Sequence, residues 1–536
     1  MQSDQQLATW ETIQKFIAAA KQPVAFERGV EPMPLTPGNF EIRLEGSRLI
    51  FQVWSTEHNL VRQVTAIETS ATPGELSLTI EKFGKKAGTL LLLDAAKPRS
   101  MQKTKRAGRL AFTEQFRNSL HRQFTGWKIA ELTCETDLEH SLSPVHPRAF
   151  LRKGQAGWAA IGSATAADAD HALTFGLIWL DYLRRRERKI TIEGLAIFLP
   201  EGQERTTAHR IRHLDTGMAQ YRLFVHADDL ELPVDCADSG NIETILPDRV
   251  ASVFAPDWVR DLPGERVDSA GEVSLRIRGL EYARWNGREL RAGIDTRRPV
   301  GEVGAPEIRA LGNEIAKMRN PGEGDRRNAL FAACPERWLE SQIRQNLSAV
   351  DASLNGPVYT QAPSFAGGER GVLDLVAIGS DGRLTVLEVK ASEDIHLPLQ
   401  ALDYWARVKW HLERGEFAAK HYFPGHVISN SSPRLFLLAP ALHFHPSTET
   451  ILAYVTSDAQ VERIGLAASW RSELKVVFRI EGRTAMNATM EARNYEGSAG
   501  AESDPGCPGT PQSGTGSGGS DEAVHDTAVC WIDAGL

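Results

Sequence analysis

The sequence predicts a mixed α/β protein of several domains, and three observations lead to this expectation. The chain has 536 residues, which is more than one hydrophobic core usually serves. Hydrophobic residues make up 42% of it and charged residues 24%, as in globular proteins and unlike disordered or fibrous ones. Segments with the alternation of β-strands are interspersed with segments that have the apolar spacing of helices. We therefore expect roughly two to four domains built from strands and helices.

The composition also disfavours several classes of protein. The formal net charge is −8, so a nucleic-acid partner has to be held by local basic patches. No apolar run approaches the roughly 18–20 residues of a membrane span, and residues 1–21 lack the apolar stretch of a secretory signal. The five cysteines lie far apart without a Cys-x-x-Cys pair, which disfavours a zinc ribbon and a disulfide framework. We expect a cytoplasmic protein with no membrane partner.

Residues 1–95 are expected to form a β-rich module, because residues 40–44 and 49–53 alternate on either side of a short turn. A basic stretch follows, since Lys97–Arg109 contains six basic residues and no acidic one. It is interpreted either as a solvated linker or as an arm that contacts phosphates.

Residues 96–250 are expected to form a second α/β domain. The apolar patterns predict, in order, a helix over 112–124, strands over 128–134 and 149–161, a helix over 173–185 and a strand over 190–199. The basic cluster Arg184–Lys189 falls at the end of the second helix. It therefore suits the helix macrodipole, and a phosphate-contacting role is the alternative.

The rest of the chain divides into three parts. Residues 251–329 are expected to be a connecting segment, with Val273–Ile277 as one weak strand. Residues 330–480 again have an α/β pattern. Residues 481–536 are rich in Gly, Ser and Pro, cannot bury enough apolar surface, and are expected to be disordered.

The most informative residues form a predicted hairpin. Two β-rich runs, 371–378 and 383–391, flank a turn that contains an Asp-Gly pair. Centring the hairpin on Asp381 places Asp374 directly opposite Glu388, with Cβ atoms about 4.5–5.5 Å apart.

Lys390 follows Glu388 by two residues and therefore projects from the same face. The two runs are otherwise apolar, so carboxylates and a lysine are costly there unless they are compensated. Two carboxylates at this separation need a cation between them, and hard oxygen ligands select Mg²⁺ or Mn²⁺. A nearby lysine can orient a metal-bound water or help to deprotonate it. The alternative is a structural ion pair of Lys390 with Glu388 or Asp374.

This arrangement resembles the PD-(D/E)XK nuclease superfamily over about residues 330–440. The resemblance is carried by Asp374, by Glu388-Val389-Lys390, by a preceding helix over 335–343 and by a following helix that contains 400–405. It implies a restriction-endonuclease-like αβββαβ core with a first strand over 358–362 and a last strand over 434–438. Leu373 stands where the family motif has Pro.

The resemblance implies a catalytic set of Asp374, Glu388, Lys390, Glu340 and Gln400, with Mg²⁺ or Mn²⁺ as cofactor. The metal would be held by Asp374, Glu388, the backbone carbonyl of Val389 and Glu340, the last directly or through water. Glu340 is preferred over Glu336 because it follows the Leu-Glu pairing common in the family. Lys390 would position the attacking water, and Gln400 would orient the site or touch the nucleic-acid backbone.

We therefore expect a cytoplasmic metal-dependent nuclease, an endonuclease with DNA as the favoured nucleic acid and a homodimer as an allowed assembly. The alternative is a module that keeps the nuclease fold but only binds nucleic acid or protein. In a third class, a structural protein, the ion pair would be incidental.

The middle of the chain is interpreted in two ways. Its predicted elements follow the same order as residues 330–440, and Leu180-Asp181-Tyr182 echoes Leu402-Asp403-Tyr404. Aligned on that echo, Trp158–Ile161 stands where Glu-x-Lys would be. Residues 96–250 are therefore either a catalytically dead copy of the nuclease-like domain or an unrelated α/β domain.

Overall fold

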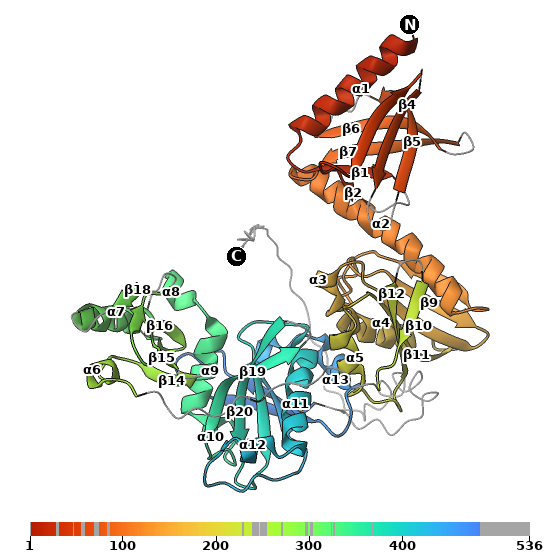
Figure 1. The fold of residues 1–536 in the computed structure, drawn as a ribbon. Helices are drawn as coiled ribbons and strands as arrows, with labels where there is room; N and C mark the ends of the chain where they lie inside the picture. Colours follow the sequence, from red (N-terminus) through yellow and green to blue (C-terminus); the bar gives the residue numbers. More distant parts are fainter. Residues whose placement is uncertain are drawn as a thin grey trace, which may run out of the picture. The chain divides into compact units, whose positions relative to one another are not determined.

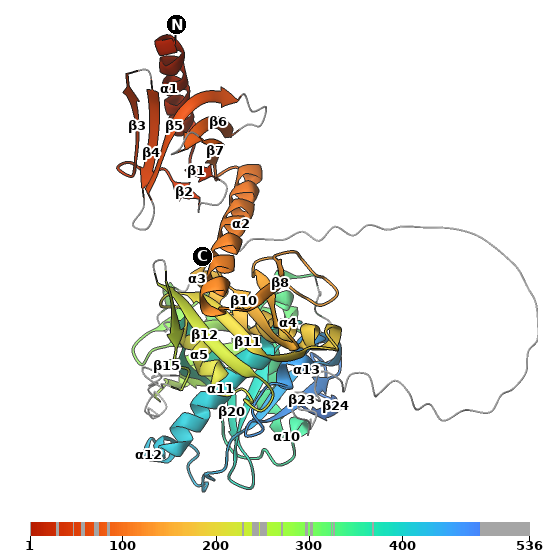
Figure 2. The same ribbon diagram turned by 90° about the vertical axis from the view of Figure 1, so that its right-hand side faces the viewer.

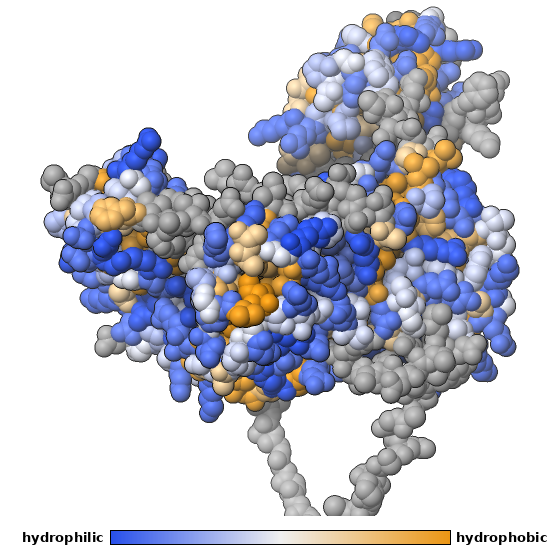
Figure 3. Space-filling model, turned by 60° about the horizontal axis from the view of Figure 1, so that its bottom comes forward, coloured by the Kyte–Doolittle hydropathy of each residue, from blue (hydrophilic) through white to orange (hydrophobic). Residues whose placement is uncertain are grey.

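The structure is a computed structural model in which the chain is mixed α/β, with four sheets among the described residues (Figure 1). The described residues are 2–27, 32–46, 48–54, 59–68, 74–82, 86–227, 230–237, 246, 254–269, 272–294, 298–300, 304–322, 324, 327–366 and 369–482. The tail predicted over 481–536 thus lies outside them, apart from its first two residues. On the face shown in Figure 3, hydrophilic residues predominate and apolar residues form smaller patches. Within these described ranges, no helix is both long and apolar enough to cross a membrane.

The N-terminal residues form a seven-stranded antiparallel sheet in the order β2-β1-β7-β6-β5-β4-β3. The predicted hairpin is present, because Phe40 pairs with Val53 and Glu45 with Arg48. A helix that the sequence analysis did not predict, α1 (Gln2–Ala19), lies along one face of the sheet (Figure 2) and buries Ile13 there. The strands are β1 (Pro23–Glu27), β2 (Met33–Pro34), β3 (Phe40–Glu45), β4 (Arg48–Trp54), β5 (Asn59–Glu68), β6 (Glu75–Lys82) and β7 (Lys86–Asp94).

One long helix, α2 (Pro98–Gln123), contains both the basic stretch and the helix predicted over 112–124 (Figure 2). It begins with proline at a position where a missing N–H costs nothing. The stretch expected to be a linker or an arm therefore has a helical backbone, while its side chains from 98 to 107 lie outside the described part of the chain. At the other end of α2, Phe116 and Leu120 are buried against the next sheet.

The middle residues form a six-stranded sheet in the order β13-β12-β11-β10-β9-β8. The strands predicted over 128–134 and 190–199 are present as β8 and β11, but the single strand predicted over 149–161 is wrong: the chain turns at Gly154, where φ is +65°, and forms the antiparallel hairpin of β9 and β10. Strands β12 and β13 were not predicted. Helix α4 packs on β10 and β11, and its Arg184 is buried and donates to the carbonyls of Ile192 and Met218, which favours the structural role for this arginine. The elements are β8 (Lys128–Thr133), β9 (Arg148–Lys153), β10 (Ala156–Gly162), α3 (Ala166–Ala169), α4 (Ala172–Arg186), β11 (Thr191–Pro200), α5 (Arg205–Ile211), β12 (Gln220–Ala227) and β13 (Leu230–Val234).

Residues 251–329 were expected to connect two domains, but they instead form a five-stranded antiparallel sheet with a core of its own. The strand predicted over Val273–Ile277 is present as β15 of this sheet, and its neighbour β16 buries the charged Glu281 among apolar residues. The elements are α6 (Asp257–Arg260), β14 (Glu265–Ser269), β15 (Glu272–Ile277), β16 (Leu280–Trp285), β17 (Leu290–Ala292), β18 (Arg298–Val300), α7 (Ala305–Met318) and α8 (Ala329–Ala332).

The C-terminal sheet has six strands in the order β19-β20-β21-β22-β23-β24. Helix α9 covers one face and α11 the other (Figure 1), with Leu339 of α9 buried beside Leu387 and Trp405 of α11 beside Val386. The elements are α9 (Pro335–Gln345), α10 (Leu347–Val350), β19 (Val358–Ala366), β20 (Glu369–Ile378), β21 (Leu384–Val389), α11 (Leu397–Glu413), α12 (Glu416–Ala419), β22 (Arg434–Pro440), η2 (Ala441–His443), α13 (Ser447–Leu452), β23 (Gln460–Leu466) and β24 (Val476–Glu481).

The two six-stranded sheets have the same topology. In each, the first three strands are antiparallel, the third, fourth and fifth are parallel, and the sixth is antiparallel to the fifth. A helix precedes the first strand, and helices connect the third strand to the fourth and the fourth to the fifth. This agreement favours the interpretation of the middle residues as a copy of the C-terminal domain.

The two domains that contain these sheets meet in a reciprocal way. Helix α4 contacts α13, and α11, the counterpart of α4, contacts α5, the counterpart of α13. An isolated β-bridge joins Leu214 to Val455, and each of these residues lies three positions after the end of its helix. Contacts that repeat with the partners exchanged are typical of a twofold interface. One chain thus contains a seam built like that of a symmetric dimer.

Candidate active site

The β20–β21 hairpin has the register that the sequence predicts. Leu375 pairs with Leu387 and Ile378 with Leu384, as expected for a hairpin centred on Asp381. Continued by one residue, this register brings position 374 opposite Glu388. The backbone of Asp374 belongs to β20, and its side chain lies outside the described part of the chain.

Glu388 belongs to the face of the sheet that α11 covers. Leu387 and Val389 pack in the cluster that contains α9, whereas Val386 packs in the cluster that contains α11. Because strand residues alternate between faces, Glu388 and Lys390 share the α11 side. Glu388 is nonetheless only 3% exposed, so its carboxylate is a buried charge that needs compensation.

Lys390 lies between two carboxylates at the end of β21. Its Nζ is 4.0 Å from Oε1 of Glu388 and 3.3 Å from Oδ2 of Asp394. Its backbone N–H donates to the carbonyl of Leu438 on the parallel strand β22, which fixes where the lysine leaves the sheet. Asp394 was not identified from the sequence, and only its position four residues after Lys390, in a polar loop, could have drawn attention to it.

Glu340 lies on the other side of the sheet. It is buried in α9, whose Leu339 and Ile343 pack on the face of Leu387. Burial lowers the pKa of the Arg276 guanidinium of β15, and the negative charge of Glu340 opposes part of this shift. Glu340 therefore interacts electrostatically with a residue of the five-stranded sheet. Glu336, the other candidate, is half-buried and accepts a hydrogen bond from Oγ of Ser392 at 3.4 Å.

The remaining predicted residues are Val389 and Gln400, which lie on β21 and α11. Val389 is the last residue of β21 and is buried. Gln400 is half-buried in the first turns of α11, the helix that covers the face of Glu388. Gln400 therefore lies on the helix that covers the face of Glu388, whereas Glu340 lies on α9, which covers the opposite face.

The residue types fit a hard divalent cation, although the described side chains alone do not assemble the full ligand set. Carboxylate and carbonyl oxygens at the end of β21 are the donors that Mg²⁺ and Mn²⁺ prefer. No group of three or more His, Cys, Asp or Glu able to hold a metal occurs among the described side chains, which do not include that of Asp374. The predicted metal centre therefore stays a prediction.

The middle sheet lacks these donors at the corresponding positions. The N–H of Ser163 donates to the carbonyl of Phe198 just as that of Lys390 donates to Leu438, so Ser163 corresponds to Lys390. Ile161 then corresponds to Glu388, and its cross-strand partner Arg148 corresponds to Asp374. Arg148 and Ile161 supply no carboxylate, so the middle sheet lacks the two acidic ligands of the predicted metal centre at the equivalent positions.

No family model matches the chain, and neither a curated protein nor a solved structure was found to match it.

Proposed function

We propose that the chain is a divalent-metal-dependent nuclease that hydrolyses phosphodiester bonds, with DNA as the favoured substrate. In this proposal residues 330–440 are a PD-(D/E)XK core. The observation that carries it is the register of β20 and β21, with Leu375 opposite Leu387; continued by one residue, it brings position 374 opposite Glu388, and Lys390 follows two residues further on. The chain order α9-β19-β20-β21-α11-β22, with β21 and β22 parallel, supports the same core.

The chain's own residues have separate tasks in this mechanism. Asp374, Glu388 and the backbone carbonyl of Val389 would hold the cation. The cation would in turn compensate the buried negative charge of Glu388. A bound Mg²⁺ supplies a Lewis acid that polarises the phosphoryl oxygen and lowers the pKa of a coordinated water. Lys390 would orient the attacking water, and Asp394, 3.3 Å from its ammonium, would hold the lysine in place.

A non-catalytic binding module is the second candidate. The observation in its favour is the middle sheet, where the same topology is kept with Arg148, Ile161 and Ser163 in place of the acidic and basic residues. The topology of the middle sheet is thus kept with residue types other than those of the predicted metal centre. In the C-terminal copy, however, the buried Glu388 and the adjacent Lys390 are present, which favours catalysis there.

The decisive experiment uses labelled single- and double-stranded DNA and RNA with Mn²⁺, Mg²⁺ or EDTA. The proposal predicts metal-dependent cleavage by the wild-type protein and none by Asp374→Asn or Lys390→Ala. Glu393→Gln is the matched control, because Glu393 lies in the same loop and its side chain is 52% exposed. Undiminished cleavage by both site variants would refute the proposal, and binding without cleavage by the wild type would support the second candidate.

A further inference from the structure

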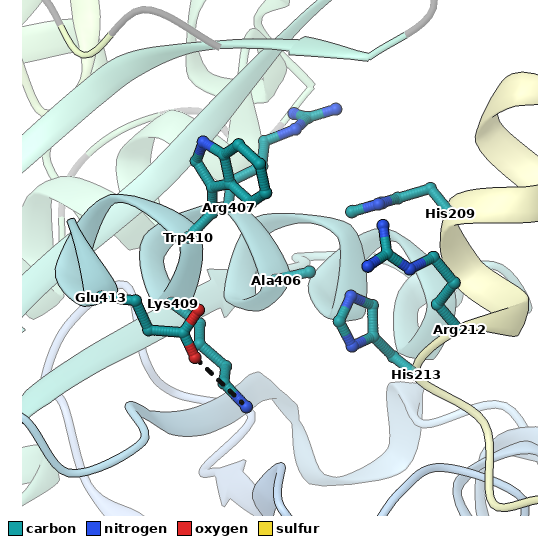
Figure 4. A pocket seen from close by; sticks show the side chains of 8 residues that line it. All are labelled: His209, Arg212, His213, Ala406, Arg407, Lys409, Trp410 and Glu413. Atoms are coloured by element: carbon teal, nitrogen blue, oxygen red, sulfur yellow. Dashed lines mark ion pairs between the residues drawn. The ribbon is translucent and has the colours of Figure 1, made fainter. Parts of the chain in front are cut away.

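A hollow of about 220 Å³ lies at the seam between the two six-stranded sheets (Figure 4). Helix α5 and the turn after it form one wall, and α11 forms the other. Figure 4 shows His209, Arg212 and His213 directed from the first wall toward Ala406 of the second. The C-terminal half of α11 contributes Arg407, Lys409 and Trp410 to the lining. Residues about 200 positions apart in the sequence thus line one pocket.

The lining is predominantly cationic. Arg212, Arg407 and Lys409 face a single lining carboxylate, Glu413, which pairs with Lys409 at 3.8 Å. Asp458 makes a second ion pair with Lys409 from outside the lining. Burial and then Arg407, Arg212 and Arg210 lower the pKa of His209 to about 4. The excess of cationic lining side chains indicates a positive potential inside the hollow.

His209 also offers a hydrogen bond that the described residues do not use. Both of its ring nitrogens are buried, and neither has a hydrogen-bond partner among the described residues. A neutral imidazole carries a hydrogen on one of these nitrogens. A buried donor of this kind is costly unless an acceptor reaches it, and an anionic oxygen in the hollow would be such an acceptor.

We propose that this hollow binds the phosphate group of a phosphate monoester. A volume below the roughly 300–1,000 Å³ of typical ligand pockets admits one phosphoryl group but not a whole nucleotide. Arginine side chains match the oxygens of phosphate, and the lysine adds a point charge. The monoester belongs either to a free mononucleotide or to the 5′ end of a nucleic-acid strand. In both cases the bound group joins α5 to α11, the helix that also carries Gln400.

Isothermal titration calorimetry of the full-length protein in EDTA tests this site without the proposed metal centre. The probes are inorganic phosphate, adenosine 5′-monophosphate, adenosine and a 12-nucleotide DNA with or without a 5′ phosphate. We expect one molecule of the monophosphate to bind per chain and adenosine not to bind. Binding of the DNA only when it is phosphorylated would add strand ends as a source of the monoester.

Substitutions then assign the binding to the hollow. Arg212→Gln is expected to weaken binding of adenosine 5′-monophosphate at least tenfold, and Arg212 is exposed, so the fold should tolerate the change. Lys409→Met is a second variant with the same expected direction. Arg188→Gln is the matched control, because it removes one exposed arginine elsewhere. Equal binding by wild type and both pocket variants, or binding of DNA regardless of its 5′ phosphate with no binding of the small monoesters, would overturn the proposal.

Discussion

His171 and His396 stack on each other, with ring centroids 4.0 Å apart and ring planes inclined by 16°. Each histidine stands immediately before the helix that connects the third and fourth strands of its sheet, His171 before α4 and His396 before α11. Equivalent residues meet in this way where a twofold axis passes. The seam of this single chain is therefore built like a homodimer interface, with metal-site residue types in only one half.

The first prediction concerns the metal. Glu388→Gln keeps the shape of a buried side chain and removes its charge, so Mn²⁺ affinity should fall by more than about a hundredfold, the upper end of what loss of a supporting residue costs. Titration calorimetry with Mn²⁺ measures this directly. The exposed Glu393→Gln should bind as the wild type does. An unchanged affinity in Glu388→Gln would remove Glu388 from the ligand set.

The second prediction separates Glu340 from the ligands. Since Glu340 lies on α9 beside Arg276, Glu340→Gln should leave Mn²⁺ affinity within about tenfold of the wild type and should instead lower the free energy of unfolding by about 1–3 kcal/mol. Urea denaturation and Mn²⁺ titration of the same sample distinguish the two effects. Loss of metal binding with unchanged stability would make Glu340 a ligand after all.

Local patterns explain what the sequence could predict. The register of β20 and β21 follows from an Asp-Gly turn and a two-residue period, both of which lie within about twenty residues, so the positions of Asp374 and Glu388 could be inferred. In α1, Trp10, Ile13 and Ile17 have the spacing of an amphipathic helix and pack on the sheet, so the sequence carries a local signal for this helix as well. No local rule exists for contacts across the seam.

Three features illustrate that limit. Residues 251–329 bury charged side chains whose partners lie on the neighbouring strand, such as Glu281, whose Oε2 lies 3.9 Å from Nη2 of Arg276. Asp394 gains its significance from the lysine it faces. The cationic hollow forms only when α5 and α11 meet, and nothing near His209 in the sequence indicates that Arg407 lies opposite.

The third prediction tests the seam. Arg210 of α5 and Asp403 of α11 form a buried pair, with Nη2 and Oδ2 2.8 Å apart and side chains 8% and 9% exposed. Asp403→Leu leaves a buried guanidinium without its carboxylate and should lower the free energy of unfolding by about 3–5 kcal/mol. Adding Arg210→Met should restore much of the lost free energy of unfolding, because neither member of the buried pair then carries a charge. Breaking the exposed Arg43–Glu45 pair should cost less than about 1 kcal/mol. A double variant no more stable than Asp403→Leu would contradict this account.

The fourth prediction concerns pH. Burial lowers the pKa of His146 to about 4 from the ordinary value of 6.5. The folded state thus resists a proton that the unfolded chain accepts. The contribution of the neutral His146 to the free energy of unfolding is at most about 3 kcal/mol. It is complete above about pH 6.5 and is lost as the pH falls toward 4. His146→Phe should therefore flatten the decline in urea midpoint between pH 7 and pH 4.5. The exposed His121→Phe is the control. An equally steep decline in His146→Phe and the wild type would show that His146 does not limit acid stability.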